Sequence, residues 1–447
     1  MIDTFTIRCN ILHLAFSGKL TNQIKEEGTA KDILDLISNR KPLVSVEDGP
    51  YTLPDSWAWV RLKDLYKINP RIIADNDTEA AFIPMERISG GFDRSFTFEI
   101  QKWEKASKNH TKFEDGDIAF AKITPCFENR KSFIAQDLPN GIGGGTTELI
   151  ILRQKEMLPQ YTYYLVLDQR FISTGTASYK GVVGQQRVQS DVIKNYLVPV
   201  APYSEQKRIV KKIEQVFSIL DTIDELQAQY ADNLTALKSK LIDAAIQGKL
   251  TEQLPEDGTA EEIYQQIQEE KQKLIKEGKI KKQKPLPEIT DDEIPFDIPE
   301  NWKWVRLGKL ISIESGRGLT ASNMNPGDFP VYGGNGIAGY HNCGFVPSKT
   351  IVIGRVGYYC GSVHITEKES WVTDNAFVTS YPEKHIDKYY LAYTLQHMKL
   401  GQNNNGAAQP VVSGKKIYPL AFPLPPLAEQ KRIVQKLEEI LPLCKKQ

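Results

Sequence analysis

The chain has 447 residues, and a length prior of ~150 residues per domain favours two or three domains. Its 56 Lys and Arg residues balance 56 Asp and Glu residues, and 40% of its residues are hydrophobic. This composition is typical of globular proteins and excludes wholesale disorder, collagen-like fibres and histone-like basic proteins. No long apolar run occurs, the N-terminus does not resemble a signal peptide, and the five cysteines form no CxxC pair. We therefore expect a cytoplasmic protein with reduced thiols and no membrane partner.

Three sequence elements occur twice along the chain. LPDSWAWVRLKDL (53–65) returns as IPENWKWVRLGKL (298–310), and SEQKRIVKKIEQ (204–215) returns as AEQKRIVQKLEE (428–439). AFSGKLT, with GTA after it, returns as AIQGKLT, again with GTA after it. Internal similarity of this kind indicates a duplicated architecture.

The order of the repeated elements indicates a circular permutation. Residues 205–247 contain a complete helix pattern, whose first part returns at 429–447 and whose last part matches 1–17. The two termini would together rebuild this helix without the residues equivalent to 224–230, a deletion of one heptad that keeps the apolar face in register. We therefore expect a pseudo-twofold molecule.

The central pattern predicts one long helix. Apolar residues recur three or four positions apart, and no Pro or Gly interrupts the run from Ser204 to Gln247. At 1.5 Å per residue the helix is ~65 Å long. We interpret its apolar stripe as buried packing, and we expect Pro442 to end the C-terminal copy early. The stripe consists of Ile209, Ile213, Val216, Leu220, Ile223, Leu226, Tyr230, Leu234, Leu237 and Leu241.

The segments between the helical elements have mixed α and β patterns. Short alternating runs predict strands, and tyrosine-rich runs predict short helices at 163–167 and 389–395. The predicted strands lie within 116–123, 147–153, 349–356 and 374–380. We interpret the lysine-rich run at 271–284 as a solvated helix and tether.

These patterns predict an α+β fold with two mixed α/β domains separated by long helices that carry a coiled-coil seam. We divide the chain into an N-terminal helical arm and linker (1–54), a first globular domain (55–202), a central long helix and linker (203–298), a second globular domain (299–426) and a C-terminal helical arm (427–447).

The sequence contains no recognisable catalytic constellation. It has no P-loop, no methyltransferase tetrapeptide, and no dinucleotide fingerprint in the Gly-rich run at 141–148. A zinc site of two His and two Cys is conceivable, but its spacing is unusual, and we predict no metal. Its residues would be His341, Cys343, Cys360 and His364. We therefore predict a binding protein and not an enzyme.

Four segments concentrate basic and amide side chains on turns, although a solvated loop is the alternative interpretation of each. Such side chains can read base edges or hold phosphates, so we expect them to contact DNA. The candidates in the first domain are Lys122, Thr124, Asn129, Arg130, Lys131, Lys180, Gln185, Gln186 and Arg187. Those in the second domain are Arg317, Asn335, Tyr340, Arg355, Asn403, Asn404, Gln409, Lys415 and Lys416.

The combination of motifs resembles the specificity subunit of type I restriction–modification enzymes. The resemblance rests on the duplicated EQxRIV tract before a long helix, the helix-GKL element and the LP-x-x-W-x-W-x-x-L opening. DGDIAFAKITPCFENRK (115–131) resembles the strand and loop of one type of target recognition domain, and 331–342, 351–363 and 371–377 resemble another type. The resemblance implies target recognition domains at 55–202 and 299–426, separated by long antiparallel coiled-coil helices. These domains would dictate a bipartite, asymmetric site on double-stranded DNA.

The resemblance also implies partners. Two modification subunits carrying S-adenosylmethionine would methylate adenine, restriction subunits would translocate DNA with ATP and Mg²⁺, and this chain would hold no cofactor. The helices would act as a ruler for the spacer between the half-sites. The residues Glu205, Gln206, Arg208, Glu429, Gln430 and Arg432 would form either a docking surface for the modification subunits or helix caps and salt bridges. A free-standing bivalent DNA-binding regulator and a coiled-coil interaction scaffold are the alternative functions.

Overall fold

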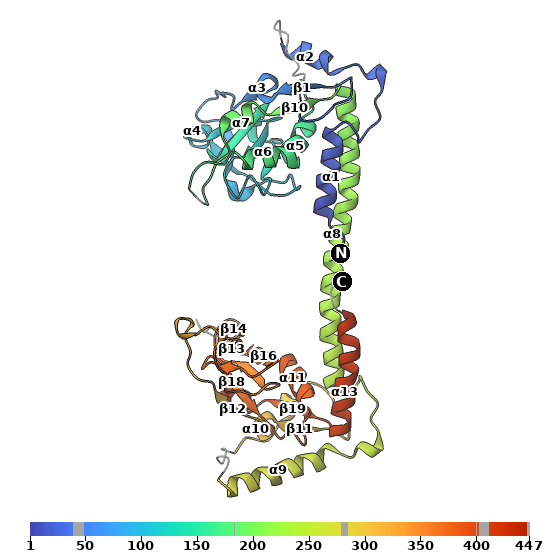
Figure 1. Cartoon of the computed structure of the whole chain (residues 1–447), viewed down its shortest axis with the longest axis vertical. Helices are drawn as coiled ribbons and strands as arrows, with labels where there is room; N and C mark the ends of the chain where they lie inside the picture. Colours follow the sequence, from blue (N-terminus) through green and yellow to red (C-terminus); the bar gives the residue numbers. More distant parts are fainter. Residues whose placement is uncertain (39–48, 183, 279–284, 399, 402–410, 445–447) are drawn as a thin grey trace. The chain divides into compact units, whose positions relative to one another are not determined.

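The computed structural model describes residues 1–38, 49–182, 184–278, 285–398, 400–401 and 411–444 (Figure 1). The chain divides into unit 1, Met1–Gln227, and unit 2, Ala228–Gln447, and the division falls inside the longest helix. Among the described residues, no helix is both long enough and apolar enough to cross a membrane.

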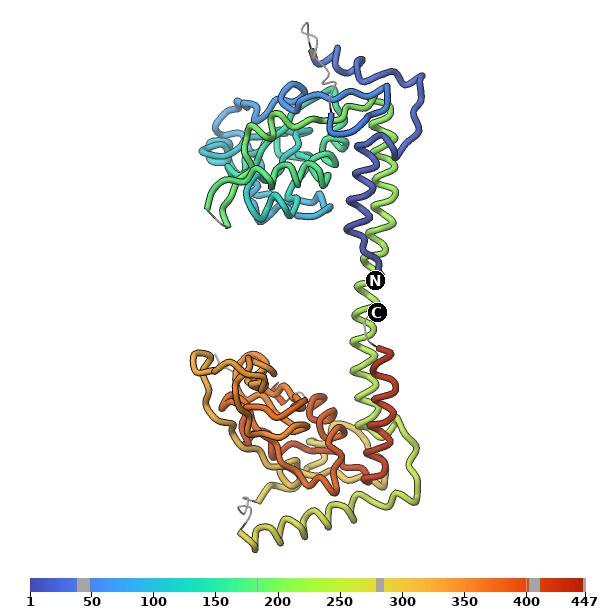
Figure 2. Tube along the Cα trace, viewed as in Figure 1, coloured from blue at the N-terminus to red at the C-terminus, as the bar shows by residue number. Residues whose placement is uncertain are grey.

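One helix, α8 (Tyr203–Ile246), contains 44 residues and confirms the prediction of an uninterrupted helix at 205–247. In unit 1, α1 (Thr4–Phe16) runs antiparallel along the first part of α8 (Figure 2). The buried Arg8 joins the two helices, since its guanidinium donates to Asp221 at 2.6 Å and to Asp224 at 2.8 Å.

The GKL element is explained by the way in which a helix ends. Gly18, just after α1, has a φ of 69°, a left-handed conformation that favours glycine. A Cβ atom at this position would lie 2.4 Å from the ring of Pro54, so the chain can turn here only without a side chain. Gly248, just after α8, has the same φ of 69°, and its Cβ would lie 2.4 Å from Pro299.

Unit 1 contains three small sheets with the strand orders β1-β10, β2-β9-β6-β7 and β4-β3-β8-β5. The pair β3–β8 is parallel, and the other pairs are antiparallel. The strands are β1 (Ala58–Arg61), β2 (Lys67–Ile68), β3 (Glu79–Ile83), β4 (Glu99–Lys102), β5 (Thr111–Glu114), β6 (Ile118–Ala121), β7 (Ser132–Ile134), β8 (Ile142–Gly145), β9 (Leu149–Arg153) and β10 (Leu197–Val200). The other helices of unit 1 are α2 (Ala30–Ser38), α3 (Leu62–Leu65), α4 (Trp103–Ser107), α5 (Pro159–Leu167), α6 (Gln169–Thr176) and α7 (Ser190–Lys194).

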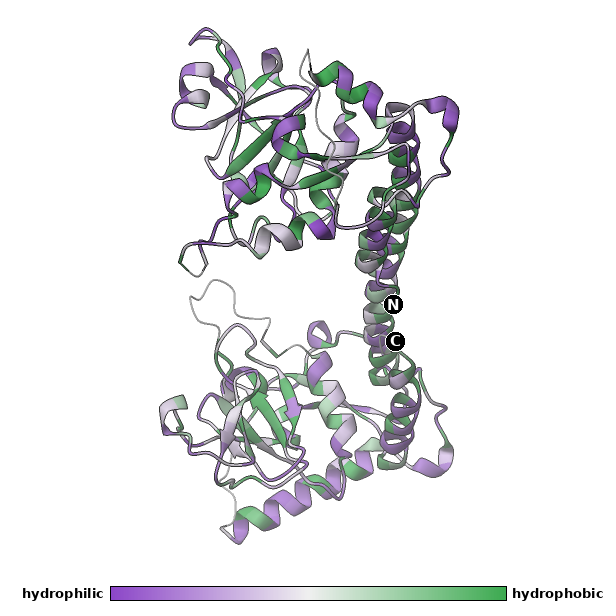
Figure 3. Ribbon diagram, turned by 45° about the horizontal axis from the view of Figure 1, so that its top comes forward, coloured by the Kyte–Doolittle hydropathy of each residue, from purple (hydrophilic) through white to green (hydrophobic). Residues whose placement is uncertain are grey.

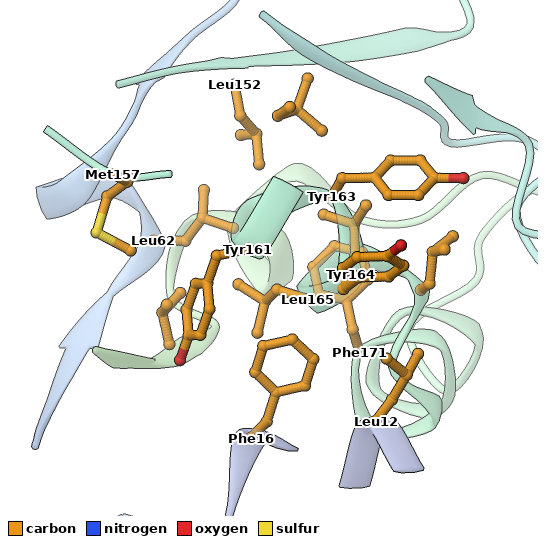
Figure 4. Close-up of a cluster of buried hydrophobic side chains, with 14 of the residues drawn as sticks. Leu12, Phe16, Leu62, Leu152, Met157, Tyr161, Tyr163, Tyr164, Leu165 and Phe171 are labelled. Atoms are coloured by element: carbon orange, nitrogen blue, oxygen red, sulfur yellow. The ribbon is translucent and has the colours of Figure 1, made fainter. Parts of the chain in front are cut away.

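The core of unit 1 forms around α5, which the tyrosine-rich run at 163–167 predicted. Figure 4 shows Tyr161, Phe16 and Leu12 in one apolar cluster, which brings α1 and α5 together. The fully buried Tyr161 donates its hydroxyl to the carbonyl oxygen of Pro199 at 2.8 Å and so also fixes β10. The cluster continues into α8 through Ile209 and Ile213.

Unit 2 contains sheets with the strand orders β11-β19, β12-β18-β15-β16 and β14-β13-β17. Its strands are β11 (Lys303–Arg306), β12 (Ser312–Ser315), β13 (Phe329–Gly333), β14 (Gly336–His341), β15 (Ile351–Gly354), β16 (Val363–Ile365), β17 (Trp371–Val372), β18 (Ala376–Ser380) and β19 (Ala421–Leu424). Its helices, besides the second half of α8, are α9 (Ala260–Lys276), α10 (Leu307–Leu310), α11 (Lys388–His397), α12 (Gly414–Ile417) and α13 (Leu427–Ile440).

The last helix of unit 2 confirms the predicted early end of the C-terminal copy. Helix α13 ends at Ile440, and a 3-10 turn containing Pro442 follows. The helix lies along the second part of α8 (Figure 2). Ile433, Val434 and Leu437 of α13 share a core with Ala245.

The two units repeat one skeleton. The sheet β2-β9-β6-β7 of unit 1 corresponds to β12-β18-β15-β16 of unit 2, and the parallel pair β3–β8 corresponds to β13–β17. Unit 1 adds β5 and α4 to this skeleton. The four predicted strand runs contain β6, β9, β15 and β18, as expected.

Two interpretations of the helices were wrong in part. Leu226, Tyr230 and Leu237 of the α8 stripe are exposed, because no described residues of α1 or α13 cover this part of the helix. In Figure 3, α9 carries mostly hydrophilic residues, as a solvated helix should. Lys271 of α9 nevertheless packs inward and donates to the carbonyl oxygens of Gly308 at 3.2 Å and Lys309 at 2.8 Å.

Candidate nucleic-acid interface

The structure brings the two basic segments of the first domain together. The amide of Val188 donates to the carbonyl oxygen of Lys122 at 2.9 Å, and the amide of Thr124 donates to Gln186 at 2.9 Å. Lys180 and Arg187 pair through two backbone hydrogen bonds of 3.1 and 2.9 Å. We call the described residues of 122–131 and 179–188 the unit 1 loop site.

Most candidate side chains of the unit 1 loop site reach solvent. Asn129, Lys180, Gln185 and Arg187 are exposed, and the partly exposed ones are Lys122, Thr124, Lys131 and Gln186. Within the unit, Thr124 donates its hydroxyl to Glu128 at 2.6 Å, and the ammonium of Lys131 donates to the carbonyl oxygen of Met85 at 2.8 Å. The site therefore presents amide and basic groups on a short, hydrogen-bonded double loop.

Arg130 does not belong to this surface, which corrects its assignment as a DNA contact. Only 6% of the residue is exposed, because its guanidinium donates to the carbonyl oxygen of Leu167 at 2.9 Å and to Gln169 at 2.6 Å. The guanidinium also lies 5.0 Å from the ring centroid of Phe5. Burial lowers the pKa of Arg130. This arginine holds the loop against α5 and α6.

Glu148 is a residue of this site that the sequence did not reveal. It follows β8, and its carboxylate accepts from Arg187 Nε at 2.9 Å and from Nη2 at 2.7 Å. Its carbonyl oxygen accepts from the amide of Lys122 at 2.8 Å. The Arg187 hydrogen bond lowers the pKa of Glu148, so the carboxylate is ionised at neutral pH. Only the pairing of β6 with β9 brings Glu148 beside Lys122, and the sequence carries no signal for that register.

The corresponding loops of unit 2 also meet. The amide of Val412 donates to the carbonyl oxygen of Arg355 at 2.8 Å. We call the described residues of 355–361 and 411–416 the unit 2 loop site. Arg355 is partly exposed, and its guanidinium lies 5.5 Å from the ring centroid of Phe377. Lys415 and Lys416 are exposed. The candidates Asn403, Asn404 and Gln409 lie outside the described residues.

The remaining candidates of unit 2 differ in whether their segments pack on this loop site. Asn335 is exposed in the turn between β13 and β14, and a Cβ at the adjacent Gly334 would lie 2.5 Å from the carbonyl oxygen of Val356. The turn therefore packs directly on the loop site. Tyr340 is exposed near the other end of β14. Arg317 is exposed and stacks on Phe345, with 4.2 Å between its guanidinium carbon and the ring centroid.

The two loop sites occupy the same place in the shared skeleton. Lys122 follows β6 and receives a hydrogen bond from Val188, whereas Arg355 follows β15 and receives one from Val412. The amide of Lys122 donates to the carbonyl oxygen of Glu148, and the amide of Arg355 donates to the equivalent carbonyl oxygen of Asn375, each at 2.8 Å. The backbone frame is thus repeated while the side chains on it differ.

The EQxR residues form an internal clasp in each unit, and the burial of the two glutamates and two glutamines corrects their assignment as a docking surface. Glu205 is 1% exposed and accepts from Trp57 Nε1 at 2.8 Å and from Gln23 at 2.7 Å. Glu429 is fully buried and accepts from Trp302 Nε1 at 2.8 Å and from Gln253 at 2.9 Å. These carboxylates are inaccessible to another subunit, because neighbouring side chains of the same unit surround them.

The glutamines and arginines of the motif complete the clasp. Gln206 and Gln430 are fully buried and donate to the carbonyl oxygens of Ala201 and Pro425, each at 2.9 Å. Arg208 pairs with Glu27 at 2.6 Å, and Arg432 pairs with Asp257 at 2.5 Å. These two ion pairs confirm the salt-bridge interpretation of the motif. Of its six residues, only the two arginines are partly exposed.

One residue of the conceivable zinc site, His341, holds a neighbouring loop through a hydrogen bond. The Nδ1 atom of His341 accepts a hydrogen bond from the amide of Asn325 at 3.0 Å, and Cys343 is exposed. Within the part of the chain that the structure describes, no group of three or more His, Cys, Asp or Glu side chains could hold a metal ion.

Comparisons with known proteins agree with this architecture. The family of type I restriction modification DNA specificity domains matches residues 54–229 and 299–444. The specificity subunit of the Escherichia coli type I restriction enzyme EcoAI is 30% identical, over 98% of this chain and 88% of its own length. The specificity subunit of EcoEI, also from Escherichia coli, is 37% identical over 68% of this chain and 61% of its own length.

Two solved structures share the fold. A chain from a type I R-M system, described for its complex assembly and conformational transition, aligns with a TM-score of 0.67 at 19% identity, covering 88% of this chain and 92% of that chain. The HsdS subunit from Thermoanaerobacter tengcongensis aligns with a TM-score of 0.52 at 19% identity, over 89% of this chain and 92% of that chain. Neither a free-standing regulator nor a coiled-coil scaffold is favoured by these matches. The two matched segments and the EcoAI relative show that the chain belongs to the family of type I restriction–modification specificity subunits.

Proposed function

We propose that each unit reads one half of a bipartite, asymmetric site on double-stranded DNA. The observation that carries the proposal is the repeated backbone frame that holds Lys122 and its neighbours in unit 1 and Arg355 and its neighbours in unit 2. A common frame with different side chains suits two modules that bind the same kind of ligand and read different sequences. Arginine and amide side chains would read base edges, and lysines would contact phosphates.

In this proposal α8 sets the spacer between the half-sites. A continuous helix of 44 residues resists bending, and at 1.5 Å per residue it is ~66 Å long. The clasp at Glu205 attaches Trp57, just before β1 of unit 1, directly to α8 through a buried hydrogen bond. The clasp at Glu429 attaches Trp302, just before β11 of unit 2, to α13, whose apolar residues share a core with Ala245 of α8. The spacer would therefore be fixed in length and free in sequence.

The docking surface for two modification subunits would be the uncovered part of α8. Its exposed apolar side chains are Leu226, Tyr230 and Leu237. Exposed apolar groups along one helix are typical of protein–protein contacts. S-adenosylmethionine would be held by the modification subunits, which methylate adenine, and ATP and Mg²⁺ by restriction subunits. This chain would direct the reaction without catalysing it.

The experiment that tests the proposal compares one base-reading substitution in each loop site. The chain is produced with its cognate modification subunit, and the methylated motif is read by long-read sequencing. Gln185→Ala, which removes an exposed amide of the unit 1 loop site, should relax one half-site, and Arg355→Ala should relax the other. If both substitutions affected the same half-site, the two-module proposal would be wrong.

A further inference from the structure

The pair of Glu148 and Arg187 carries an inference that rests on the proposed function and deepens it. We propose that this pair is the specificity-determining element of unit 1 for one G·C base pair. Arg187 would donate to guanine O6 and N7, and the Glu148 carboxylate would accept from the N4 amino group of cytosine. These are the contacts that each side chain makes best in the major groove, and one G·C pair presents both.

The geometry leaves both side chains able to bind a base pair while they remain paired. Arg187 uses Nε and one N–H of Nη2 for Glu148, with 2.9 Å from Nε to Oε2 and 2.7 Å from Nη2 to Oε1. The outer edge of the guanidinium, formed by Nη1 and the second N–H of Nη2, has one long contact of 3.3 Å to the carbonyl oxygen of Gln185. A carboxylate has about four lone-pair sites, so Oε2 keeps acceptor capacity beyond Arg187.

The backbone holds this pair firmly at the centre of the unit 1 loop site. Glu148 is tied to Lys122 by the 2.8 Å bond from the lysine amide to its carbonyl oxygen. Arg187 is tied to Lys180 by backbone bonds in both directions. The arginine side chain is 45% exposed and the glutamate side chain 20%, so the pair faces solvent on a rigid support. An arginine oriented in this way loses little conformational freedom when it binds a base.

The equivalent positions of unit 2 show that the fold does not require an ion pair here. Asn375 takes the place of Glu148. Val411 takes the place of Arg187, because it directly precedes Val412, whose amide donates to Arg355, and because it pairs with Val356 as Arg187 pairs with Ile123. Asn375 and Val411 are both exposed. A carboxylate on a phosphate-binding surface opposes general affinity for DNA, so Glu148 suits base recognition better than backbone contact.

The test measures base discrimination by the complex of the chain with its cognate modification subunit. Methylation rates are compared on duplexes that carry the wild-type motif or a single base-pair change at each half-site position. Glu148→Gln and Arg187→Val should both reduce discrimination at the same G·C pair, by roughly 5- to 150-fold, the range that one good base contact spans. All other positions of the first half-site, and every position of the second half-site, should keep their preference.

The matched control is the ion pair of Arg87 and Glu99, which has a similar distance of 2.7 Å and side-chain exposures of 36% and 49%. Arg87→Gln should leave the motif unchanged. If Glu148→Gln fails to fold, as judged by thermal unfolding, Glu148→Asn replaces it, because unit 2 carries Asn375 at this place.

Three results would overturn the inference. The motif could stay unchanged in both variants, the two variants could relax different positions, or methylation could slow equally on all duplexes. A wild-type complex that methylates no bipartite motif would contradict the proposed function itself, and this inference with it. If the wild-type complex methylates a bipartite motif but the variants behave in one of these three ways, the inference fails while the proposed function stands.

Discussion

The indole nitrogen of Trp57 donates a hydrogen bond of 2.8 Å to the carboxylate of Glu205, and this bond joins the start of the first domain to the long helix. Trp302 and Glu429 form the same bond at 2.8 Å in unit 2. A buried carboxylate is stable only when it is paired or hydrogen-bonded. The W-x-W opening and the EQxR tract are therefore two halves of one structural device, which the chain contains twice.

Removing one donor from this device should destabilise unit 1. Trp57→Phe replaces the indole by a smaller aromatic ring and leaves Glu205 with Thr21 and Gln23 as its donors. We expect a loss of ~1–3 kcal/mol in the free energy of unfolding, the usual penalty for an unmet buried polar group. Urea denaturation monitored by circular dichroism measures it. Trp59→Phe, which removes a 3.2 Å bond to the carbonyl oxygen of Tyr51, is the milder control. A Trp57→Phe variant as stable as the wild type would contradict the clasp.

Arg130 should matter for stability and not for base recognition. Arg130→Met removes charge-assisted hydrogen bonds to Leu167 and Gln169 and leaves a buried carbonyl oxygen unpaired. We expect the melting temperature to fall, with a loss of ~2–4 kcal/mol. The methylated motif should stay the same, as measured by sequencing at a temperature where the variant is folded. A relaxed motif with unchanged stability would restore Arg130 as a DNA contact.

The stability of unit 2 should increase with pH above 8 because of Lys271. Burial, helped by the charge of Lys309, lowers the pKa of Lys271 from its usual 10.5 to about 8. Between these two values the unfolded chain binds a proton that the folded chain has released, so the free energy of unfolding rises with pH. Urea denaturation between pH 8 and 9.5 should show this slope in the wild type and less of it in Lys271→Met. Equal slopes in both proteins would show that Lys271 is not buried in solution.

Docking of the modification subunits should depend on the uncovered part of α8. Replacing Leu226 and Tyr230 by serine removes exposed apolar side chains without opening a core, so thermal stability should stay within ~0.5 kcal/mol. Binding to the modification subunit, measured by calorimetry, should weaken at least tenfold. The double substitution Lys63→Ser and Lys194→Ser, on unit 1 away from α8, serves as the control. Unchanged affinity of the α8 variant would place the docking surface elsewhere.

The helix and strand pattern was largely predictable, because it depends on local sequence. The absence of Pro and Gly between Ser204 and Gln247 predicted α8 to within a few residues, and Pro442 predicted the end of α13. The duplicated motifs also predicted that the two halves share a skeleton. Burial along α8 was less predictable, since it depends on how far α1 and α13 extend beside it.

The candidate interface was predictable as a set of loops but not residue by residue. The charge pattern predicted both Arg130 and Arg187 as DNA contacts. Arg130 is buried against α5 and α6, whereas Arg187 is exposed. The difference arises from tertiary contacts to Leu167 and Glu148, which are distant in sequence. The EQxR tract looked like a surface motif for the same reason, because the tryptophans that cover its glutamates lie more than 120 residues away.

The methylome of a methylation-deficient host tests the central claim most directly. The host would carry the cognate modification subunit with and without this chain, and long-read sequencing would map methyladenine. We predict a new bipartite motif, with two specific half-sites and a spacer of fixed length and free sequence, only when the chain is present. Two folded proteins that together produce no motif, or produce one undivided motif, would contradict the account.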